Sequence, residues 1–464
     1  MFIRLLFLIL IISSACKSSF SQKYVQKYGR GCLYDSSRYE QIPLTAPLFR
    51  GNEGLPTSAS LREFCPTPGN QGDYGTCTAW ASAYAARTIL MAQRFQMTPE
   101  EISKQAFSPS YVYNQIRLTS DCMYGIYIAD ALDLLKNEGC VTYNEFGYEC
   151  EKSVTDTDKQ KAKDNMIQDY KRLFVRNSST AESSIITPVK KALSEGKPVV
   201  ISLQCFASFD DAKDLWTPSP NDQSNGYHAM AVIAYDDKMY GGAFQLMNSW
   251  GVGWGKGGFT WVKYADFKKY CMEAYEVVDF KYNPHSPKLS HSGEVVFKKS
   301  DGENMEAFLE KNVFKMNQNY FSGTSFQFLM SHNEPVYLYA IGTDLSKKCS
   351  LLFPYNQGIS PLLSYNKGTV IFPADQYYVQ LDNTKGIDYV CILYANESLN
   401  IEEIMQKMEK LEGDIYSRLS EAVGKKRIIP AIDYSKEGKI GFRATRNINE
   451  SGKIVPLIVE IRHE

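Results

Sequence analysis

After its first dozen residues, the sequence has no hydrophobic run that approaches the length of a membrane-spanning helix. We therefore expect no membrane segment in the body of the chain. Neither sign of charge dominates, since 51 basic residues stand against 52 acidic residues, and no long basic run occurs. This balance argues against nucleic acid as a partner. Histidine is scarce, with five residues, so few side chains can serve as a catalytic imidazole.

The one long hydrophobic run lies at the N-terminus, over residues 5–12, and Arg4 precedes it. It is too short to span a bilayer comfortably, so we predict a secretory signal over residues 1–16 and an exported protein. Cys16 follows "SSA", which resembles the cleavage site of bacterial lipoproteins. Lipidation of Cys16 and ordinary cleavage after Ala15 are both consistent with this pattern. The expected location is secreted, periplasmic or attached to a membrane through a lipid on Cys16.

The chain is long enough for two domains, each with its own hydrophobic core. Residues 17–54 are polar and show no helix pattern, and we interpret them as a short N-terminal segment. Residues 55–281 contain a helical half followed by a strand-rich half, which predicts the α+β class. Residues 282–293 are rich in proline and serine and are predicted to be a linker. Residues 294–464 alternate like the strands of a β-sandwich and are predicted to form an accessory domain.

Two segments of the first domain carry local signals of their own. The stretch "TPVKKALSEGKPVVISLQ" predicts a helix with Thr187 as its N-cap and Pro188 in its first turn. Gly196 ends this helix, and a strand follows. Residues 151–183 are charged and polar, and we predict an inserted helix and loop at the surface.

The stretch "GNQGDYGTCTAWASAYA" places Cys77 at the start of a predicted helix. A helix N-terminus and a neighbouring imidazolium both stabilise a thiolate, so Cys77 is a candidate nucleophile. His228, in "SNGYHAMAVIAY", lies at the mouth of a predicted strand, and Asn248, in "LMNSWGVGWGKGGF", belongs to the next one. Consecutive antiparallel strands would let the Asn248 amide orient the imidazole. The other histidines lie outside this domain: His285, His291, His332 and His463.

The order Cys, His, Asn and the sequences around these residues resemble the papain family of cysteine peptidases. The stretch "NQGDYGTC" is similar to the family's approach to the nucleophile, with Gln71 six residues before Cys77. "GYHAMAVIAY" resembles the histidine strand, and "NSWGVGWGKGGF" resembles the asparagine segment almost letter for letter. The resemblance covers roughly residues 55–280. It implies a helical lobe and a β-barrel-like lobe, and it implies no metal and no cofactor.

The resemblance also implies the roles of particular side chains. Cys77 would attack the scissile carbonyl as a thiolate, and His228 would hold the ion pair and protonate the leaving amine. Asn248 would orient His228, and Trp250 would shield their hydrogen bond from water. Gln71, taken as an exposed amide at the edge of the cleft, would donate to the oxyanion together with the N–H of Cys77.

The resemblance also implies which residues bind the substrate. Two features of the sequence depart from the family pattern. Gly125, in "CMYGIY", would bind an extended peptide along its backbone, with Ile126 and Tyr127 lining the adjoining apolar pocket. Tyr74 stands where the family usually has a cysteine, so Cys122 is expected to be free or differently paired. The family's long inhibitory propeptide is missing as well, because too few residues separate the predicted signal from the domain. Either the enzyme emerges active or something else restrains it.

The sequence alone does not assign the pairing of the cysteines or the role of the C-terminal region. Besides Cys16 there are ten cysteines, and if Cys77 is catalytic at least one other must stay unpaired. Cys349 and Cys391 lie in predicted strands, where core thiols are commoner than a disulfide. Residues 294–464 contain neither a nucleophile with a base nor a metal-ligand cluster. They are vaguely similar to accessory domains of bacterial peptidases, and their partner stays unassigned between a peptide, a protein and the cell envelope.

The leading hypothesis is an exported cysteine peptidase that hydrolyses a peptide or protein substrate through a thioester acyl-enzyme. A second hypothesis is a papain-fold binding or scaffold protein without turnover. Its usual sign is a replaced Cys, His or Gln, and all three residues are present here. A third hypothesis is a thiol transamidase or an aminopeptidase that uses the same nucleophile.

Overall fold

The computed structural model describes most of the chain. The described residues are 27–46, 54–176, 181–219, 222–279, 288–356, 358–365, 368–374, 377–436, 438–447 and 451–464. The predicted signal peptide, with Cys16, lies outside them, as do residues 282–287 of the predicted linker. In the part of the chain that is described, no helix is both long and apolar enough to cross a membrane.

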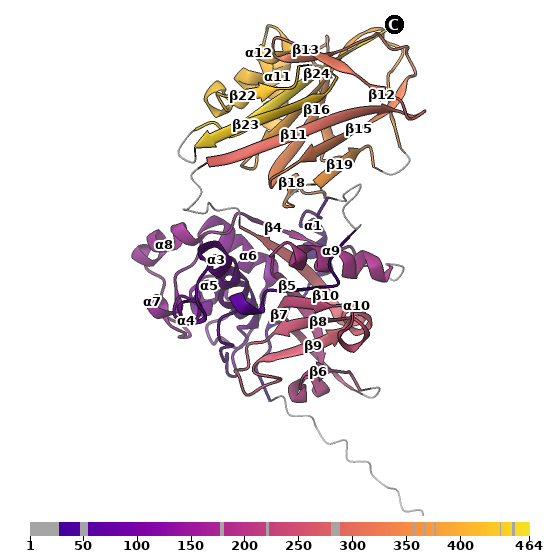
Figure 1. The fold of residues 1–464 in the computed structure, drawn as a ribbon. Coiled ribbons are helices and arrows are strands. Elements are labelled where there is room, and N and C mark those ends of the chain that lie inside the picture. Colours follow the sequence, from indigo (N-terminus) through magenta and orange to yellow (C-terminus); the bar gives the residue numbers. More distant parts are fainter. Residues whose placement is uncertain are drawn as a thin grey trace, which may run out of the picture.

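Two units with largely separate hydrophobic cores make up the described chain. We call residues 27–279 the N-terminal unit and residues 288–464 the C-terminal unit. Figure 1 shows the N-terminal unit in indigo to pink and the C-terminal unit, in orange and yellow, beyond one edge of it. The first unit combines helices with one large sheet, and the second stacks two sheets. The predicted α+β class, with two lobes followed by a β-sandwich, is confirmed.

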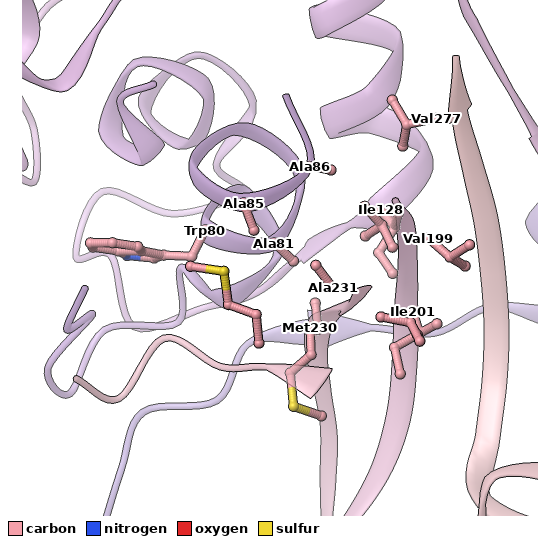
Figure 2. Close-up of a cluster of buried hydrophobic side chains, with 14 of the residues drawn as sticks. Trp80, Ala81, Ala85, Ala86, Ile128, Val199, Ile201, Met230, Ala231 and Val277 are labelled. Carbon is pink, nitrogen blue, oxygen red and sulfur yellow. The ribbon is translucent and has the colours of Figure 1, made fainter. Parts of the chain in front are cut away.

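Helices form the first lobe of the N-terminal unit. They are η1 (Arg62–Phe64), α2 (Cys77–Ala79), η2 (Trp80–Arg87), α3 (Thr88–Phe95), α4 (Pro99–Lys104), α5 (Pro109–Ile116), α6 (Ile128–Asn137), α7 (Tyr143–Phe146), α8 (Asp156–Ala162) and η3 (Lys163–Asn165). The central helix runs without a break through α2, η2 and α3, and its many alanines favour helix while allowing close packing. Figure 2 shows Ala81 and Ala85 of this helix facing Met230 and Ala231 of the second lobe.

An eight-stranded sheet forms the second lobe. Its strands are β2 (Ser58–Ser60), β4 (Asp169–Arg172), β5 (Val199–Phe206), β6 (Leu215–Trp216), β7 (Ser224–Asp236), β8 (Ala243–Met247), β9 (Phe259–Lys263) and β10 (Cys271–Val278). They lie in the order β4-β10-β5-β7-β8-β9-β6, and β2 also pairs with β7. In the antiparallel pair β7–β8, Ala231 lies opposite Met247, the last residue of β8. This register brings Asn248 close to His228, as the sequence predicted.

The remaining elements of this unit connect the lobes or cover the sheet. They are β1 (Cys32–Leu33), α1 (Ser36–Gln41), β3 (Ile126–Tyr127), α9 (Glu182–Ser194), η4 (Ala207–Asp211), η5 (Met239–Gly241) and α10 (Tyr264–Tyr270). The N-terminal segment is therefore not irregular throughout, because it contains β1 and α1. Asp35 caps α1 by accepting hydrogen bonds from two backbone N–H groups, and Tyr39 is buried.

One local prediction in this unit is wrong, and the prediction for residues 151–183 is correct for the helix α8 but not for the strand that follows it. Helix α9 begins at Glu182, and Pro188 lies inside it, because the buried Ile185 and Ile186 extend the packed face before the predicted cap. Residues 151–183 include the strand β4, whose four residues are all buried and pair with β10. Their charges suggested exposure, but the buried Lys171 ammonium has partners in the C-terminal unit, donating to Leu362 O at 3.0 Å and to a serine hydroxyl.

The C-terminal unit stacks two sheets and adds two helices. One sheet contains β11 (Lys288–Lys299), β12 (Asn304–Met305), β15 (Ser325–His332), β19 (Gly368–Phe372), β20 (Val379–Gln380), β22 (Ile432–Tyr434) and β23 (Ile440–Asn447). The other contains β13 (Ala307–Glu310), β14 (Val313–Met316), β16 (Val336–Asp344), β17 (Cys349–Phe353), β18 (Leu362–Leu363), β21 (Gly386–Ala395) and β24 (Ile454–His463). The helices are α11 (Ile401–Lys410) and α12 (Ile415–Val423), and η6 (Lys425–Arg427) follows them.

Both faces of the second sheet are buried, which explains its continuous apolar strands. Leu338 and Ala340 of β16 face the core between the sheets. Tyr339 and Ile341 point the other way, into a third cluster that includes Met408 of α11. The predicted linker is partly wrong, since residues 288–293 belong to β11 and pair with β23, and Gly293 pairs with β15 as well.

One disulfide is present among the described cysteines. It joins Cys122 to Cys150, so Cys122 has a partner other than the family's usual one. Cys349 and Cys391 are not bonded to each other. The bridge ties the loop before Gly125 to the loop after α7, and it thereby fixes one wall of the candidate site.

Candidate active site

Cys77 lies at the junction of the two lobes. It is the first residue of α2 and is completely buried. Its Sγ accepts hydrogen bonds from the backbone N–H of Ala229 on β7, at 3.5 Å, and of Gly31 in the N-terminal segment, at 3.3 Å. The predicted helix start is therefore correct, and the thiol meets the strand that carries His228.

His228 and Asn248 form the predicted hydrogen bond. The imidazole Nε2 lies 2.7 Å from Asn248 Oδ1. Trp250 stacks on the imidazole, with ring centroids 4.5 Å apart and planes inclined by 29°. Because Nε2 is engaged with the amide, Nδ1 is the atom left for proton transfer, and it has no hydrogen-bond partner among the described residues.

Gln71 differs from the expectation of an exposed amide, because its side chain is fully buried. Its Nε2 donates to Tyr74 O at 2.7 Å and to Gly29 O at 3.1 Å, and its Oε1 accepts from Ser249 Oγ at 2.6 Å. The amide is thus fixed in orientation. Sequence reasoning missed Ser249, although its place directly after Asn248 in the matched motif was a usable signal.

The predicted substrate-binding strand already pairs with another part of the chain. Ile126 and Tyr127 form β3, which pairs in parallel with Cys32 and Leu33 of β1. Beside it, a Cβ atom on Gly125 would collide with the backbone of Gly31. Residues 31–33 therefore occupy the place where the sequence analysis expected an extended peptide.

We call residues 27–33 the cleft segment, because they run through the whole candidate site. Tyr28 stacks on Trp250 at a centroid distance of 4.5 Å, and the Trp250 indole N–H donates to Gly29 O at 3.2 Å. Gly31 then faces Cys77. Sequence reasoning missed this role, although the alternating glycines in "YGRGC" were a signal for close backbone approach.

Burial under the cleft segment favours the uncharged forms of Cys77 and His228. It lowers the pKa of His228 to about 3. It also raises the pKa of Cys77, although the N–H groups of Ala229 and Gly31 act in the opposite direction. With the segment in place, the pair is therefore a neutral thiol and a neutral imidazole. The thiolate that the sequence analysis expected at neutral pH requires removal of this cover.

No metal site accompanies these groups in the described part of the chain. Among those residues, no group of three or more histidine, cysteine and carboxylate side chains could hold a metal ion. The described groups of the site are a thiol, a positioned imidazole and nearby amide donors.

Residues 55–279 match the family model described as papain family cysteine protease. This part of the chain is therefore a papain-family cysteine peptidase domain, and the protein is a hydrolase of the cysteine peptidase class. No curated protein gave a significant match.

Several solved structures are similar to this chain. One is xylellain, a cysteine protease from Xylella fastidiosa, with 22% identity and a TM-score of 0.46, covering 55% of this chain and 97% of that one. Another is digestive procathepsin L 3 of the Tenebrio molitor larval midgut, with 17% identity and a TM-score of 0.41, covering 54% and 76%. Bromelain from Ananas comosus shows 18% identity and a TM-score of 0.37, covering 48% and 99%.

Proposed function

We propose that this protein is an exported peptidase in which Cys77, His228 and Asn248 hydrolyse peptide bonds. The single observation that carries the proposal is the hydrogen bond between His228 and Asn248, which directs the other ring nitrogen away from the amide. Cys77 lies against the same strand, at the N-terminus of a helix. The proposal of export rests on the hydrophobic N-terminal run. Whether the exported protein is free or lipidated depends on cleavage and modification at Cys16.

The proposed reaction has two steps. The Cys77 thiolate attacks the scissile carbonyl carbon, and the tetrahedral oxyanion accepts hydrogen bonds from Gln71 Nε2 and from the N–H of Cys77. The C–N bond breaks as imidazolium His228 gives its proton to the leaving amine, which forms a thioester. Neutral His228 then takes a proton from water, whose oxygen displaces the thiolate and releases the acid.

We further propose that the described conformation is latent. The cleft segment and a peptide substrate need the same strand position beside Gly125, so they exclude each other. The seated segment is not positioned for cleavage, because the atom facing Cys77 Sγ is the amide nitrogen of Gly31 rather than a carbonyl carbon. The short cleft segment would thus restrain the enzyme in the way that the family's long inhibitory propeptide does.

Incubation of the purified full chain with a mixed peptide library tests the proposal. Cleavage is expected only in the presence of reductant, and it should stop after alkylation of Cys77, with products and labelled peptides identified by mass spectrometry. The variant Gly31→Ala is assayed in parallel, because it should not seat the segment. If neither protein cleaves any peptide, the scaffold hypothesis becomes the better one.

Replacing Gln71 by alanine should lower kcat by roughly 10²-fold, the scale associated with loss of one oxyanion donor. The same change releases Gly29 O, so the assay uses the Gly31→Ala background, in which this contact no longer matters. Gln115→Ala, which removes an amide bonded only to Tyr111 O within α5, is the matched control. An unchanged kcat in the Gln71 variant would show that the oxyanion is bound elsewhere.

A further inference from the structure

A buried ion pair lies beside the catalytic imidazole. The Arg30 side chain is only 3% exposed, and its guanidinium pairs with Asp210, whose side chain is fully buried. The guanidinium carbon lies 5.4 Å from the centroid of the Trp250 ring, which stacks on His228. We call the site around Asp210 that holds this guanidinium the acidic pocket.

Residues outside the cleft segment supply the negative charges of the acidic pocket, and the cleft segment adds one backbone N–H. Asp210 belongs to η4, where the preceding Phe209 packs edge-on against Trp250, at a centroid distance of 5.6 Å. Asp222 adds a second negative charge that acts on Arg30, and the N–H and hydroxyl of Ser208 hold its carboxylate. The Lys27 N–H donates to the other Asp210 oxygen at 3.2 Å.

Asp210 pays a desolvation cost that a cation offsets. Burial raises the pKa of its carboxyl to about 6, so the carboxyl is mostly ionised at neutral pH, and a positive partner offsets the cost of keeping that charge buried. Arg30 is that partner while the cleft segment is seated. Opening of the cleft withdraws Arg30 and leaves the carboxylate facing the space that the substrate enters.

The position of the acidic pocket along the cleft determines which substrate residue would contact it. The cleft segment passes from Trp250, at Tyr28, past Cys77, at Gly31, to β3 at Cys32. His228 must protonate the leaving amine, and Trp250 stacks on His228, so the Trp250 end of the cleft is the leaving-group side. The acidic pocket therefore lies where the first residue after the scissile bond would place its side chain.

We propose that the acidic pocket is a specificity subsite that selects arginine or lysine as the first residue on the leaving-group side of the scissile bond. This inference rests on the proposed peptidase function. Arg30 occupies the subsite in the latent form, and a basic substrate side chain replaces it in the open form. A planar guanidinium suits the Asp210 carboxylate and the face of Trp250 better than an ammonium group, so arginine is preferred to lysine.

Two substrates that differ by one charge test the subsite on the full chain. A peptide cleaved in the library assay is made with either arginine or citrulline after the scissile bond, since citrulline is uncharged and nearly isosteric. The ratio of the two kcat/KM values is the readout. The fraction of open enzyme multiplies both values equally, so the ratio does not depend on how tightly the cleft segment is held.

The expected ratio is at least tenfold in favour of arginine for the parent protein and close to one for Asp210→Asn. Asp211→Asn is the matched control, because Asp211 is the exposed neighbour in η4 that pairs only with Lys27 on the surface; its ratio should equal that of the parent. A parent ratio near one, or an unchanged ratio in Asp210→Asn, overturns the subsite and reduces Asp210 to an anchor for Arg30.

Failure of the proposed function gives a different result. If no peptide is turned over by either the parent or Gly31→Ala, calorimetry compares binding to Gly31→Ala of an arginine-containing peptide from the library and of the same peptide with citrulline in place of arginine. At least tenfold tighter binding of the arginine peptide, lost in Gly31→Ala/Asp210→Asn, then supports the pocket in a non-catalytic protein. Equal affinities overturn it.

A separate observation concerns the residues that follow the cleft segment. Leu44 forms parallel bridges with Arg172 of β4 on one side and with Ile359 of the C-terminal unit on the other. Its N–H donates to Gly358 O at 2.6 Å, and its carbonyl accepts from Ser360 N at 2.8 Å. On the opposite side, Thr45 N donates to Arg172 O at 3.0 Å. Residues 43–46 thus form a strand held between the two units.

We infer that the C-terminal unit retains the cleft segment by clamping residues 43–46. Ala46 is 1% exposed within the core cluster of that unit, and Tyr39 of α1 is anchored in the core of the N-terminal unit. The chain between cleft and clamp is therefore fixed at both ends. Loosening the clamp shortens the time that the segment stays seated.

Leu44→Pro tests the clamp, since proline removes the N–H that bonds to Gly358 O. The expected result is a severalfold rise in kcat/KM for every peptide, with an unchanged arginine-to-citrulline ratio. Ser360→Pro removes the opposite donor and should act in the same way if Leu44→Pro does not fold. Ser36→Pro, in the first turn of α1 where proline is tolerated, is the control. Folded variants with parental kcat/KM overturn the clamp.

Discussion

Serine in place of Cys77 is expected to lower kcat/KM for peptide hydrolysis by on the order of 10⁵-fold, the scale seen when a nucleophile of this kind is removed. The Cys77 thiol is the candidate nucleophile, and a serine hydroxyl in the same place has no thiolate to offer at neutral pH. The Gly31→Ala background gives the largest parent rate and thus the widest range for the measurement. Initial rates on one fluorogenic peptide, at equal protein concentrations, provide the comparison.

A matched cysteine variant separates loss of the nucleophile from general damage. Cys65 is a partly buried free thiol that donates a hydrogen bond to Leu61 O, at 3.5 Å, and Cys65→Ser should keep the parental rate. Thermal unfolding of each variant checks that the fold is retained. If Cys77→Ser hydrolyses the peptide as fast as its parent, the nucleophile is a residue other than Cys77.

Alanine in place of Gly31 is expected to raise kcat/KM for every peptide by at least tenfold. An added Cβ at this position would overlap the backbone of Gly75, which cannot move aside like a flexible side chain. The cleft segment should therefore leave the site, while Cys77 keeps its hydrogen bond from Ala229 N and His228 keeps its hydrogen bond to Asn248. A tenfold rise needs a shift of only about 1.4 kcal/mol in the equilibrium between seated and open forms.

The same variant should change the pH at which Cys77 reacts. Burial raises the thiol pKa in the seated form, so the thiolate fraction at pH 6 is small and iodoacetamide labelling of the parent is slow. Opening restores solvent and allows the ion pair with His228, which lowers the thiol pKa and raises the thiolate fraction at pH 6. Mass spectrometry of the Cys77 peptide across a pH series measures this shift.

Gly386→Ala is the control for a glycine substitution as such, because no atom lies within 4 Å of the added Cβ and the residue is far along the chain, in β21. It should leave both the rate and the labelling profile as in the parent. If Gly31→Ala shows parental kcat/KM and parental labelling at pH 6, the cleft segment does not restrain the enzyme.

Local sequence was sufficient to place the three candidate catalytic residues. Cys77 starts a helix, His228 lies on β7 and Asn248 directly follows β8, because each of these placements depends on short-range patterns around the residue. The start of α9 and the strand β4 could not be predicted in this way. Their burial depends on partners far along the chain, such as Leu362 for Lys171.

The sequence by itself determined that this protein has a papain-like domain with a thiol, an imidazole and an amide in the required order. Only the tertiary structure decided that residues 27–33 fill the cleft, that Arg30 meets Asp210 there, and that both catalytic groups are held uncharged. The physical reason is the range of the interactions. Helix starts and strand alternation are encoded by neighbouring residues, whereas the pairing of Arg30 with Asp210 joins groups that are 180 positions apart. Burial and the resulting pKa shifts exist only once such distant segments are packed together.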